Sequence, residues 1–405
     1  MAYKAVVIGM GRHGPHHLQR LTRIDDLKYG TNVGDHIGEI AIVDIDERKL
    51  HDQGERFGIP EENRFNSMDD FWGSGYNPDF AIVTPSPSAH AECAERFLYE
   101  RIPTLIEKPL SLSISNAERL AKISKERGTI SACGYQMLQE PGFIAAAEFL
   151  EEGLEIKSLN IEWLKNRGFR THPIGSIITE DTHSFGYVAK LLGESHSVAA
   201  TGNYIVIYVD ETAWNNEGIG TDDQDPDLHL FPLEGTTELN GKIYRMGEIL
   251  GTTLVKPLYL NENNGRIPTE IKLSYEYPLN RREIQIVAQI PGELDTPKKQ
   301  FGDIYHIHAG FTKIPYSGIQ PFLRIVGGID APLGKDLATR RGMGQIVEEK
   351  IYGDTDPQGE QMRLFLESIE SGTLSKELMT LDEAVSAERI ANLAEKNIMS
   401  KKARL

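Results

Sequence analysis

A short apolar run that ends in three closely spaced glycines lies near the start of the sequence: Lys4-Ala5-Val6-Val7-Ile8-Gly9-Met10-Gly11-Arg12-His13-Gly14. The apolar residues predict a buried strand, and Pro15 suits the first turn of a helix directly after the glycines. In such a strand–turn–helix, Gly9 permits the tight turn, Gly11 lets the backbone approach a pyrophosphate and Gly14 allows close helix packing. The positive end of the helix then faces an anionic ligand, so the stretch predicts a dinucleotide site.

A second apolar run, residues 40–44, ends in Asp44. A carboxylate at this place accepts hydrogen bonds from the adenosine ribose hydroxyls and repels a 2′-phosphate, so NAD is favoured over NADP. Roughly 30 residues separate Gly14 from Asp44 where ~20 is common, and we attribute the excess to an inserted loop around residues 31–38. Arg12 and His13, inside the glycine turn, complete the expected cofactor contacts on this side.

Three histidines, His13, His16 and His17, lie in the same turn and at the predicted helix start. Imidazole is the commonest protein metal ligand, so a metal site has to be weighed. The spacing lets at most some of the three share a face, and we interpret them as residues that line the phosphate turn or pack. We therefore expect no bound metal.

The first third of the sequence alternates short apolar runs with amphipathic segments, the pattern of parallel strands separated by covering helices. It predicts helices over residues 87–100 and 111–127 and strands over 4–8, 40–44, 80–84, 104–107 and 130–134. We expect residues 1–135 to form an α/β, Rossmann-type doubly wound domain that binds the dinucleotide.

After residue 141 the pattern changes to helices over 143–150 and 175–192, and then to strands over 203–209, 252–260, 269–277, 283–290, 304–311 and 322–326. Because helices do not separate these strands, we expect an α+β C-terminal domain, residues 136–380, with a large, mostly antiparallel open-faced sheet. Its exposed face predicts a homo-oligomer, a dimer or a tetramer. The segment 381–405 contains a helix that we expect to pack back across the domains.

Length and composition limit the class of protein. The 405 residues exceed the size of a single hydrophobic core, which indicates two domains. A net charge of -17 without a basic cluster disfavours a nucleic-acid partner. Cys93 and Cys133 are too few for a disulfide framework, and no apolar stretch reaches membrane-spanning length, so we expect a cytoplasmic protein.

A turn of unusual chemistry follows one predicted strand: Leu105-Ile106-Glu107-Lys108-Pro109-Leu110-Ser111. Ligands of open α/β sheets collect at the carboxyl ends of strands, where this turn lies. Taken alone, a surface ion pair before a helix explains the turn as well as catalysis does. The neighbouring motifs favour catalysis.

Those motifs are Ala81-Ile82-Val83-Thr84-Pro85 and His90 before the turn, and Gly134-Tyr135-Gln136 after it. In this order they resemble the glucose-fructose oxidoreductase and inositol dehydrogenase (Gfo/Idh/MocA) family. The resemblance implies that Lys108 is the active-site lysine and that Glu107 lies near the nicotinamide ribose. Thr84, Pro85 and His90 then belong to the same half of the cofactor site, and the second domain carries an open-faced sheet.

The family's other catalytic element is an Asp and a His four positions apart on a helix, before a Leu-Leu-Gly-like end. Here Thr179-Glu180-Asp181-Thr182-His183 precedes Leu191-Leu192-Gly193. The resemblance matches His183 to the histidine and Thr179 to the aspartate, which is a departure. On a helix Glu180 lies close to the face of His183, so we expect Glu180 to be the compensating carboxylate and Thr179 a polar contact.

A histidine with a near-neutral pKa can take a hydroxyl proton as hydride leaves the same carbon, and a neighbouring ammonium stabilises the developing alkoxide. We expect Lys108 and His183 to divide this work, with the identity of the formal base left open. For the substrate we expect contacts from Tyr135, Gln136 and Gln139. Arg170 lies in a loop that either closes over the substrate or is simply solvated.

These features predict an NAD(H)-dependent oxidoreductase that acts on a hydroxyl or keto group of a sugar, an inositol or a nucleotide sugar. Two alternatives stay open. One is a catalytically silent protein of the same fold that senses a dinucleotide or sugar, which the loss of the aspartate at Thr179 would fit. The other is an NAD-assisted hydrolase or lyase with the same cofactor site.

Overall fold

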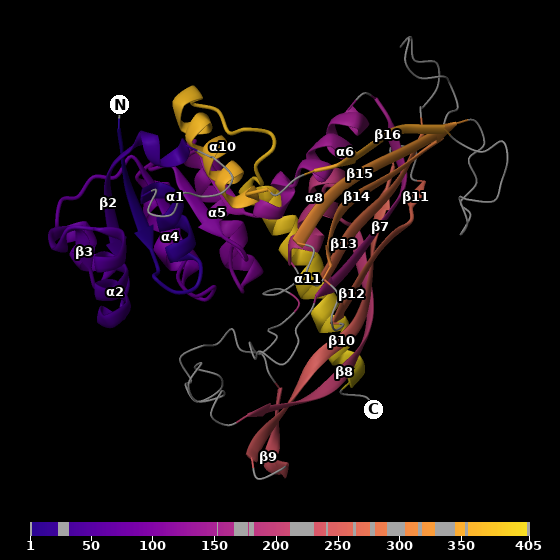
Figure 1. The fold of residues 1–405 in the computed structure, drawn as a ribbon, viewed down its shortest axis with the longest axis horizontal. Helices are drawn as coiled ribbons and strands as arrows, with labels where there is room; N and C mark the ends of the chain where they lie inside the picture. The colour runs from indigo at the N-terminus through magenta and orange to yellow at the C-terminus, as the bar shows by residue number, and fades with distance from the viewer. Residues whose placement is uncertain are drawn as a thin grey trace.

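The structure is a computed structural model that describes residues 2–22, 32–151, 153–165, 177, 182–210, 231–239, 242–261, 265–275, 280–289, 304–314, 318–328, 345–352 and 355–402. Two β-sheets dominate it, each with its own covering helices (Figure 1). The expected pairing of a doubly wound α/β domain with an open-faced sheet domain is confirmed.

The first sheet has six parallel strands in the order β3-β2-β1-β4-β5-β6. The strands are short and largely buried, as expected where helices cover both faces: β1 Tyr3–Ile8, β2 Ile37–Val43, β3 Arg64–Phe65, β4 Phe80–Val83, β5 Thr104–Glu107 and β6 Ser131–Gly134. The chain reverses its direction of winding between β1 and β4. Ligands of such sheets bind at the carboxyl ends of the strands beside that reversal.

Helices pack on both faces of this sheet. One face is covered by α3 Met68–Gly73, α4 His90–Tyr99 and α5 Ile114–Arg127. The other face is covered by α1 Gly14–Thr22, α2 Glu47–Phe57 and α10 Pro357–Ser371. Short 3-10 turns cover Asn32–His36, Glu61–Asn63 and Gln136–Gln139.

Local signals set the ends of these helices. The Asp46 carboxylate accepts hydrogen bonds from the N–H groups of Arg48 and Lys49, which caps the start of α2. Gly58 ends the same helix in a left-handed conformation with φ 64°, which glycine adopts without strain. The Asp44–Asp46 segment, next to the glycine turn, is thereby held in place.

The second sheet contains ten of the strands described: β7 Glu155–Lys165, β8 Ser197–Asp210, β9 Phe231–Leu239, β10 Lys242–Leu260, β11 Arg266–Ile267, β12 Thr269–Tyr275, β13 Asn280–Gln289, β14 Ile304–Ile314, β15 Gly318–Gly328 and β16 Gln345–Ile351. The order is β11-β10-β12-β7-β13-β14-β15-β16, with β8 and β9 also paired to β10. The pair β7 and β12 runs parallel and the other pairs are antiparallel. The prediction of a mostly antiparallel sheet is confirmed.

Among the described residues, the helices that pack on this sheet all lie on one of its faces (Figure 1). They are α6 Pro141–Glu151, α8 Thr182–Leu192 and α11 Leu381–Lys402. Along β13, Ile284, Ile286 and Ala288 are buried on the covered face, whereas Gln285 and Val287 on the other face are half-exposed. This alternation is the pattern of an open-faced sheet.

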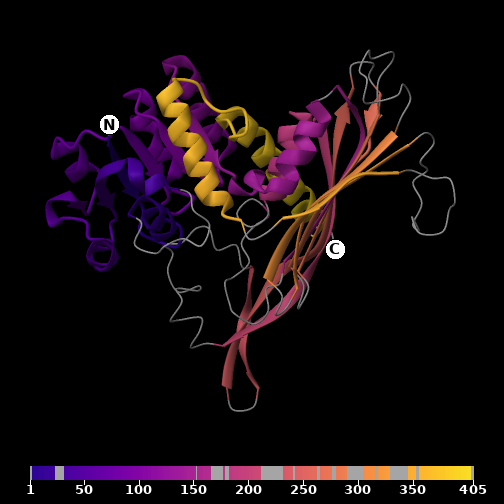
Figure 2. The same cartoon turned by 45° about the horizontal axis from the view of Figure 1, so that its top comes forward.

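The two C-terminal helices return to the first domain (Figure 2). Phe365 of α10 meets Phe80 of β4 edge-on with ring centroids 6.1 Å apart, although the sequence-based division places residues 357–371 in the second domain. α11 contacts α8 through Lys190 and Glu383 and contacts the turn after β5 through Glu388. No helix in the described part of the chain has the length and hydropathy needed to cross a membrane.

Candidate active site

The glycine turn after β1 is pressed against its neighbours at two points. Gly9 has a φ of 93°, and a Cβ there would stand 2.4 Å from the Pro85 nitrogen; a Cβ on Gly14 would stand 2.0 Å from the Gly9 oxygen. In contrast, a Cβ on Gly11 would meet no atom within 4 Å. The protein's own packing therefore does not explain a glycine at position 11. A glycine there fits a cofactor whose pyrophosphate approaches the backbone closely.

Asp44 lies beside this turn at the end of β2. Its Oδ2 accepts a hydrogen bond from the Met10 N–H at 2.5 Å, and its Oδ1 accepts one from the Asp46 N–H at 2.8 Å. These bonds orient the half-buried carboxylate next to the glycine turn. The free lone pairs of the two oxygens are the ones that ribose hydroxyls would use.

Thr84 joins the end of β4 to the glycine turn. Its N–H donates to the Ile8 carbonyl at 2.8 Å, and its hydroxyl donates to the Gly9 carbonyl at 3.1 Å. Pro85, the next residue, also packs closely against Gly9. Thr84 and Pro85 therefore lie where the cofactor site was expected.

His90, at the start of α4, connects two turns of the site. Its Nδ1 lies 2.6 Å from the Pro109 carbonyl oxygen and its Nε2 lies 3.1 Å from the Pro85 carbonyl oxygen. Burial lowers the pKa of His90, while both carbonyl contacts and the charge of Glu107 oppose this effect. Since the ring is 2% exposed and both nitrogens face backbone, His90 holds the turns that carry Pro85 and Lys108.

Glu107 is the last residue of β5 and is buried. Its Oε1 lies 3.0 Å from His17 Nε2, and its Oε2 accepts a hydrogen bond from the Lys108 N–H at 3.2 Å. Burial opposes ionisation, but the hydrogen bond from His17 and the charges of nearby histidines and Lys108 outweigh it and bring the pKa of Glu107 to about 2. Gln358 of α10 lies 3.1 Å from the same His17 nitrogen. Glu107 is therefore a buried carboxylate that α1 contacts through His17 and that the Lys108 N–H contacts from its own turn.

Lys108 follows Glu107 and is half-buried at the carboxyl end of the first sheet. The peptide bond from Lys108 to Pro109 is cis. His13 lies close enough to feel its charge: burial lowers the pKa of His13 to about 4, with a smaller lowering from Lys108 and an opposing effect of Glu107. His13 is therefore neutral at neutral pH. Lys108 is a cation near Glu107 that keeps its charge at that pH.

His183, in the first turn of α8, reaches this region through Tyr135. A Cβ on Gly134 would stand 2.8 Å from Glu107 Oε2, and Tyr135, the next residue, packs edge-on against His183 with ring centroids 5.7 Å apart. The ring of Trp163 of β7 is also stacked with His183, with ring centroids 6.2 Å apart and an interplanar angle of 20°. Two aromatic rings thus hold the His183 ring, which is 8% exposed.

The remaining predicted residues fall into three groups. Tyr135, which was expected to line the substrate pocket, is wholly buried and packs against His183. Gln139 is also buried, and its amide donates to the Glu377 carbonyl at 2.9 Å. Gln136 is half-buried, and Arg12 is exposed on the glycine turn. The expected residues that lie outside the described part of the chain are Thr179, Glu180 and Arg170.

Three residues of the site were missed because they are distant in sequence or were assigned to packing. His17 was interpreted as part of the phosphate turn or as packing, yet it binds Glu107. Gln358 and Glu388 approach from α10 and α11. Nothing in their local sequence indicates a partner more than 270 positions away. Among the described residues, no group of three His, Cys, Asp or Glu side chains is placed to hold a metal ion.

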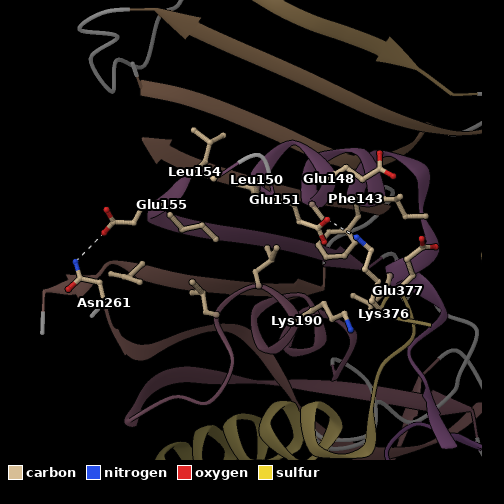
Figure 3. Close-up of a pocket in the computed structure, with 18 of the residues that line it drawn as sticks. Phe143, Glu148, Leu150, Glu151, Leu154, Glu155, Lys190, Asn261, Lys376 and Glu377 are labelled. Carbon is tan, nitrogen blue, oxygen red and sulfur yellow. Dashed lines mark hydrogen bonds and ion pairs between the residues drawn. The ribbon is translucent and has the colours of Figure 1, made fainter. Parts of the chain in front are cut away.

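A separate hollow of about 850 Å³ lies away from Lys108, between α6, the end of α8 and the β10–β11 connection (Figure 3). Its walls are mainly apolar. Two of its lining carboxylates have partners from the same lining: Lys376 Nζ lies 2.6 Å from Glu151 Oε2, and Asn261 donates to Glu155 Oε1 at 3.3 Å. None of its lining residues belongs to the glycine turn or the Lys108 turn.

Comparison with known proteins bears on residues 3–135, which match an oxidoreductase family with an NAD-binding Rossmann fold. A myo-inositol 2-dehydrogenase from Thermotoga maritima is 26% identical over 209 residues, which cover 49% of this chain and 58% of the relative. The matched region thus spans little more than half the length of that relative.

Solved structures share the fold over the whole chain. A UDP-N-acetylglucosamine 3-dehydrogenase from Acidithiobacillus ferrooxidans covers 99% of both chains with a TM-score of 0.61 and 15% identity. An oxidoreductase from Agrobacterium radiobacter, solved with NAD+, L-tartaric acid and magnesium, covers 100% of both chains with a TM-score of 0.60 and 13% identity. Residues 3–135 therefore match the Gfo/Idh/MocA oxidoreductases, with an NAD-binding Rossmann fold, and the solved structures show that the fold of the chain as a whole is shared with such enzymes.

Proposed function

We propose that the protein is an NAD(H)-dependent oxidoreductase that acts on a hydroxyl or keto group of a sugar, an inositol or a nucleotide sugar. The observation that carries the proposal is the position of Lys108 at the carboxyl end of β5. Its neighbour Glu107 contacts the helix of the glycine turn through His17 and approaches Gly134, the residue before Tyr135. Tyr135 packs on His183, and this series of contacts from Glu107 through Gly134 and Tyr135 supports a site that Lys108 and His183 share.

The residues of the glycine turn fit the dinucleotide. The backbone around Gly11 and the start of α1 would hold the pyrophosphate, and Asp44 would accept hydrogen bonds from the adenosine ribose. The same carboxylate would repel a 2′-phosphate, which is why we propose NAD in preference to NADP. NAD, when bound, supplies the hydride acceptor.

Residues of this chain would take up the proton of the substrate hydroxyl. The Lys108 ammonium would stabilise negative charge on the substrate oxygen, and His183, which packs against Tyr135 and Trp163, would exchange the proton. We retain Glu180 as the proposed carboxylate partner of His183 and Thr179 as a polar contact. For the substrate we propose contacts from Gln136 and Arg170.

The test is turnover by the pure protein with NAD and a panel of polyols, inositols, aldoses and nucleotide sugars, followed by nicotinamide absorbance. We expect NADH formation with at least one member of the panel. Tight NAD binding without turnover on the whole panel would instead support the sensing protein of the same fold. Release of a product without net NADH formation would support the NAD-assisted hydrolase or lyase.

We also propose that the protein is a homo-oligomer formed through the open face of the second sheet. On this face lie half-exposed Gln285, His306 and His308, together with exposed Arg324. A sheet face of this size without covering helices is a typical surface for contact with a second copy. Light scattering coupled to size exclusion should give a mass of two or four chains, and a monomeric mass at micromolar concentration would contradict the proposal.

A further inference from the structure

Glu388 of α11 reaches into the turn that follows Lys108. The side chain is 0% exposed. One carboxyl oxygen accepts a hydrogen bond from the Leu110 N–H, and the other accepts one from the Ser111 N–H at 3.4 Å. A single side chain, 278 positions away from Leu110, therefore provides acceptors for two consecutive backbone groups of the turn.

These two N–H groups need an acceptor from outside the turn. The turn lies between the end of β5 at Glu107 and the start of α5 at Ile114, so the ladder of the sheet does not extend to it. Leu110 and Ser111 are buried, and a buried N–H without an acceptor is costly. Glu388 meets this requirement from the C-terminal helix.

The turn is also held from the opposite side. His90 contacts the Pro109 carbonyl oxygen at 2.6 Å, so successive groups after Lys108 are held by α4 and by α11. Along α11, Glu383 binds Lys190 Nζ with both oxygens at 3.0 Å. Lys190 lies on α8, the helix that begins beside His183. α11 therefore joins the Lys108 turn to the helix of the second proposed proton-handling residue.

The titratable groups that face Glu388 come from two segments, and of these Lys108 is the charged one. Lys108 lies in the held turn, and Cys133 and Tyr135 lie at the end of β6 and just after it. Burial raises the pKa of Glu388 to about 8, although the two backbone hydrogen bonds and Lys108 oppose the effect. The environment favours the neutral carboxyl, which still accepts hydrogen bonds from both N–H groups.

We propose that Glu388 is a positioning residue, which holds the turn that bears Lys108 and, through α11, sets that turn against the helix of His183. The catalytic part of this inference rests on the proposed function of Lys108. The structural part concerns the turn alone and can be tested without a substrate.

The first test measures amide hydrogen exchange at Leu110 and Ser111 in the full-length protein. Glu388→Met keeps the length of the side chain and removes both acceptors, so we expect exchange at both amides to become about tenfold faster. Glu395→Met is the matched control, because Glu395 is a largely buried carboxyl about two turns further along the same helix. We expect the control to leave both amides unchanged, and unchanged exchange in Glu388→Met would overturn the inference.

A second variant covers the case in which Glu388→Met does not fold. Glu388→Gln has one acceptor oxygen in place of two, and its NH2 group faces one of the N–H donors. We therefore expect one of the two amides to exchange about tenfold faster while the other keeps its protection. Full protection of both amides in this variant would also overturn the inference.

The catalytic part is tested by kinetics and by the rate at which an amine-reactive anhydride labels Lys108, read by mass spectrometry. For Glu388→Met we expect a kcat about tenfold lower, an NAD affinity within about twofold of the wild type, and a Lys108 labelling rate changed at least about threefold. Glu388→Gln should recover part of the kcat. Faster amide exchange with unchanged kcat and unchanged labelling would overturn the positioning role.

The failure of the proposed function would look different. A wild-type protein without turnover on the substrate panel counts against the oxidoreductase proposal alone. Amide exchange and Lys108 labelling then still decide whether Glu388 holds the turn, because neither measurement uses a substrate.

Discussion

His17 Nε2 lies 3.0 Å from Glu107 Oε1, and both side chains are buried. Because the pKa of Glu107 is about 2, its carboxylate is the acceptor and the His17 nitrogen carries the hydrogen. The bond joins α1, which follows the glycine turn, to the strand end that bears Lys108. The cofactor side and the chemical side of the site thus share one buried hydrogen bond.

Loss of this bond should lower stability. His17→Ala leaves the buried Glu107 carboxylate without its donor, so we expect the free energy of unfolding to fall by about 2 kcal/mol. His16→Ala changes an exposed histidine on the same helix and should cost less than about 0.5 kcal/mol. Urea denaturation at pH 7 measures both values, and equal effects in the two variants would contradict the assigned bond.

Removal of the Lys108 ammonium should abolish turnover. Lys108→Met keeps the apolar stem of the side chain, and we expect kcat to fall at least about 100-fold because charge on the substrate oxygen is no longer stabilised. NAD affinity, measured by calorimetry, should stay within about threefold. Lys122→Met, a change of a lysine whose side chain is 72% exposed, is the control and should leave kcat unchanged. Retained activity in Lys108→Met would rule out the assigned role.

The charge of Asp44 should determine the choice between NAD and NADP. Asp44→Asn removes the charge that would repel a 2′-phosphate, so the ratio of kcat/KM for NADP to that for NAD should rise about tenfold. Asp46→Asn is the control, since Asp46 caps α2 and should affect stability more than cofactor choice. An unchanged ratio in Asp44→Asn would remove Asp44 from the selection of the cofactor.

Local patterns predicted five of the six strands of the first sheet, and β3, with two residues, was missed. The strand over 104–107 was predicted with the bounds that the structure has, and the runs before Gly9 and Asp44 form β1 and β2. Such strands are buried on both faces, so each appears in the sequence as a continuous apolar run between turn residues. The position of Lys108 at a strand end follows from the same pattern.

The second domain and the supports of the site were harder to predict. β7 was missed because its buried positions, Leu159, Ile161 and Trp163, alternate with polar residues and carry a weaker signal than a continuous run. The packing of α10 on the first sheet and the contact of Glu388 with Leu110 depend on tertiary structure alone. No local propensity encodes a bond across 278 positions.

Two carboxyls on α11 whose pKa values are raised should make stability depend on pH. Burial raises the pKa of Glu388 to about 8 and that of Glu395 to about 7, from an ordinary value of 4.5. As the pH rises above 4.5, the unfolded chain releases these protons while the folded protein keeps them. The free energy of unfolding should therefore fall with rising pH, by up to about 1.4 kcal/mol per pH unit for each group, until its folded-state pKa is passed.

Glu388→Gln and Glu395→Gln separate the two contributions. The difference in free energy of unfolding between wild type and Glu388→Gln should fall steadily up to about pH 8 and then become constant, since Gln does not titrate. For Glu395→Gln the same difference should become constant near pH 7. Urea denaturation across this range measures both curves. If wild type and Glu388→Gln keep a constant difference at every pH, the pKa of Glu388 is the same in the folded and the unfolded protein, and the raised pKa assigned to its burial is wrong.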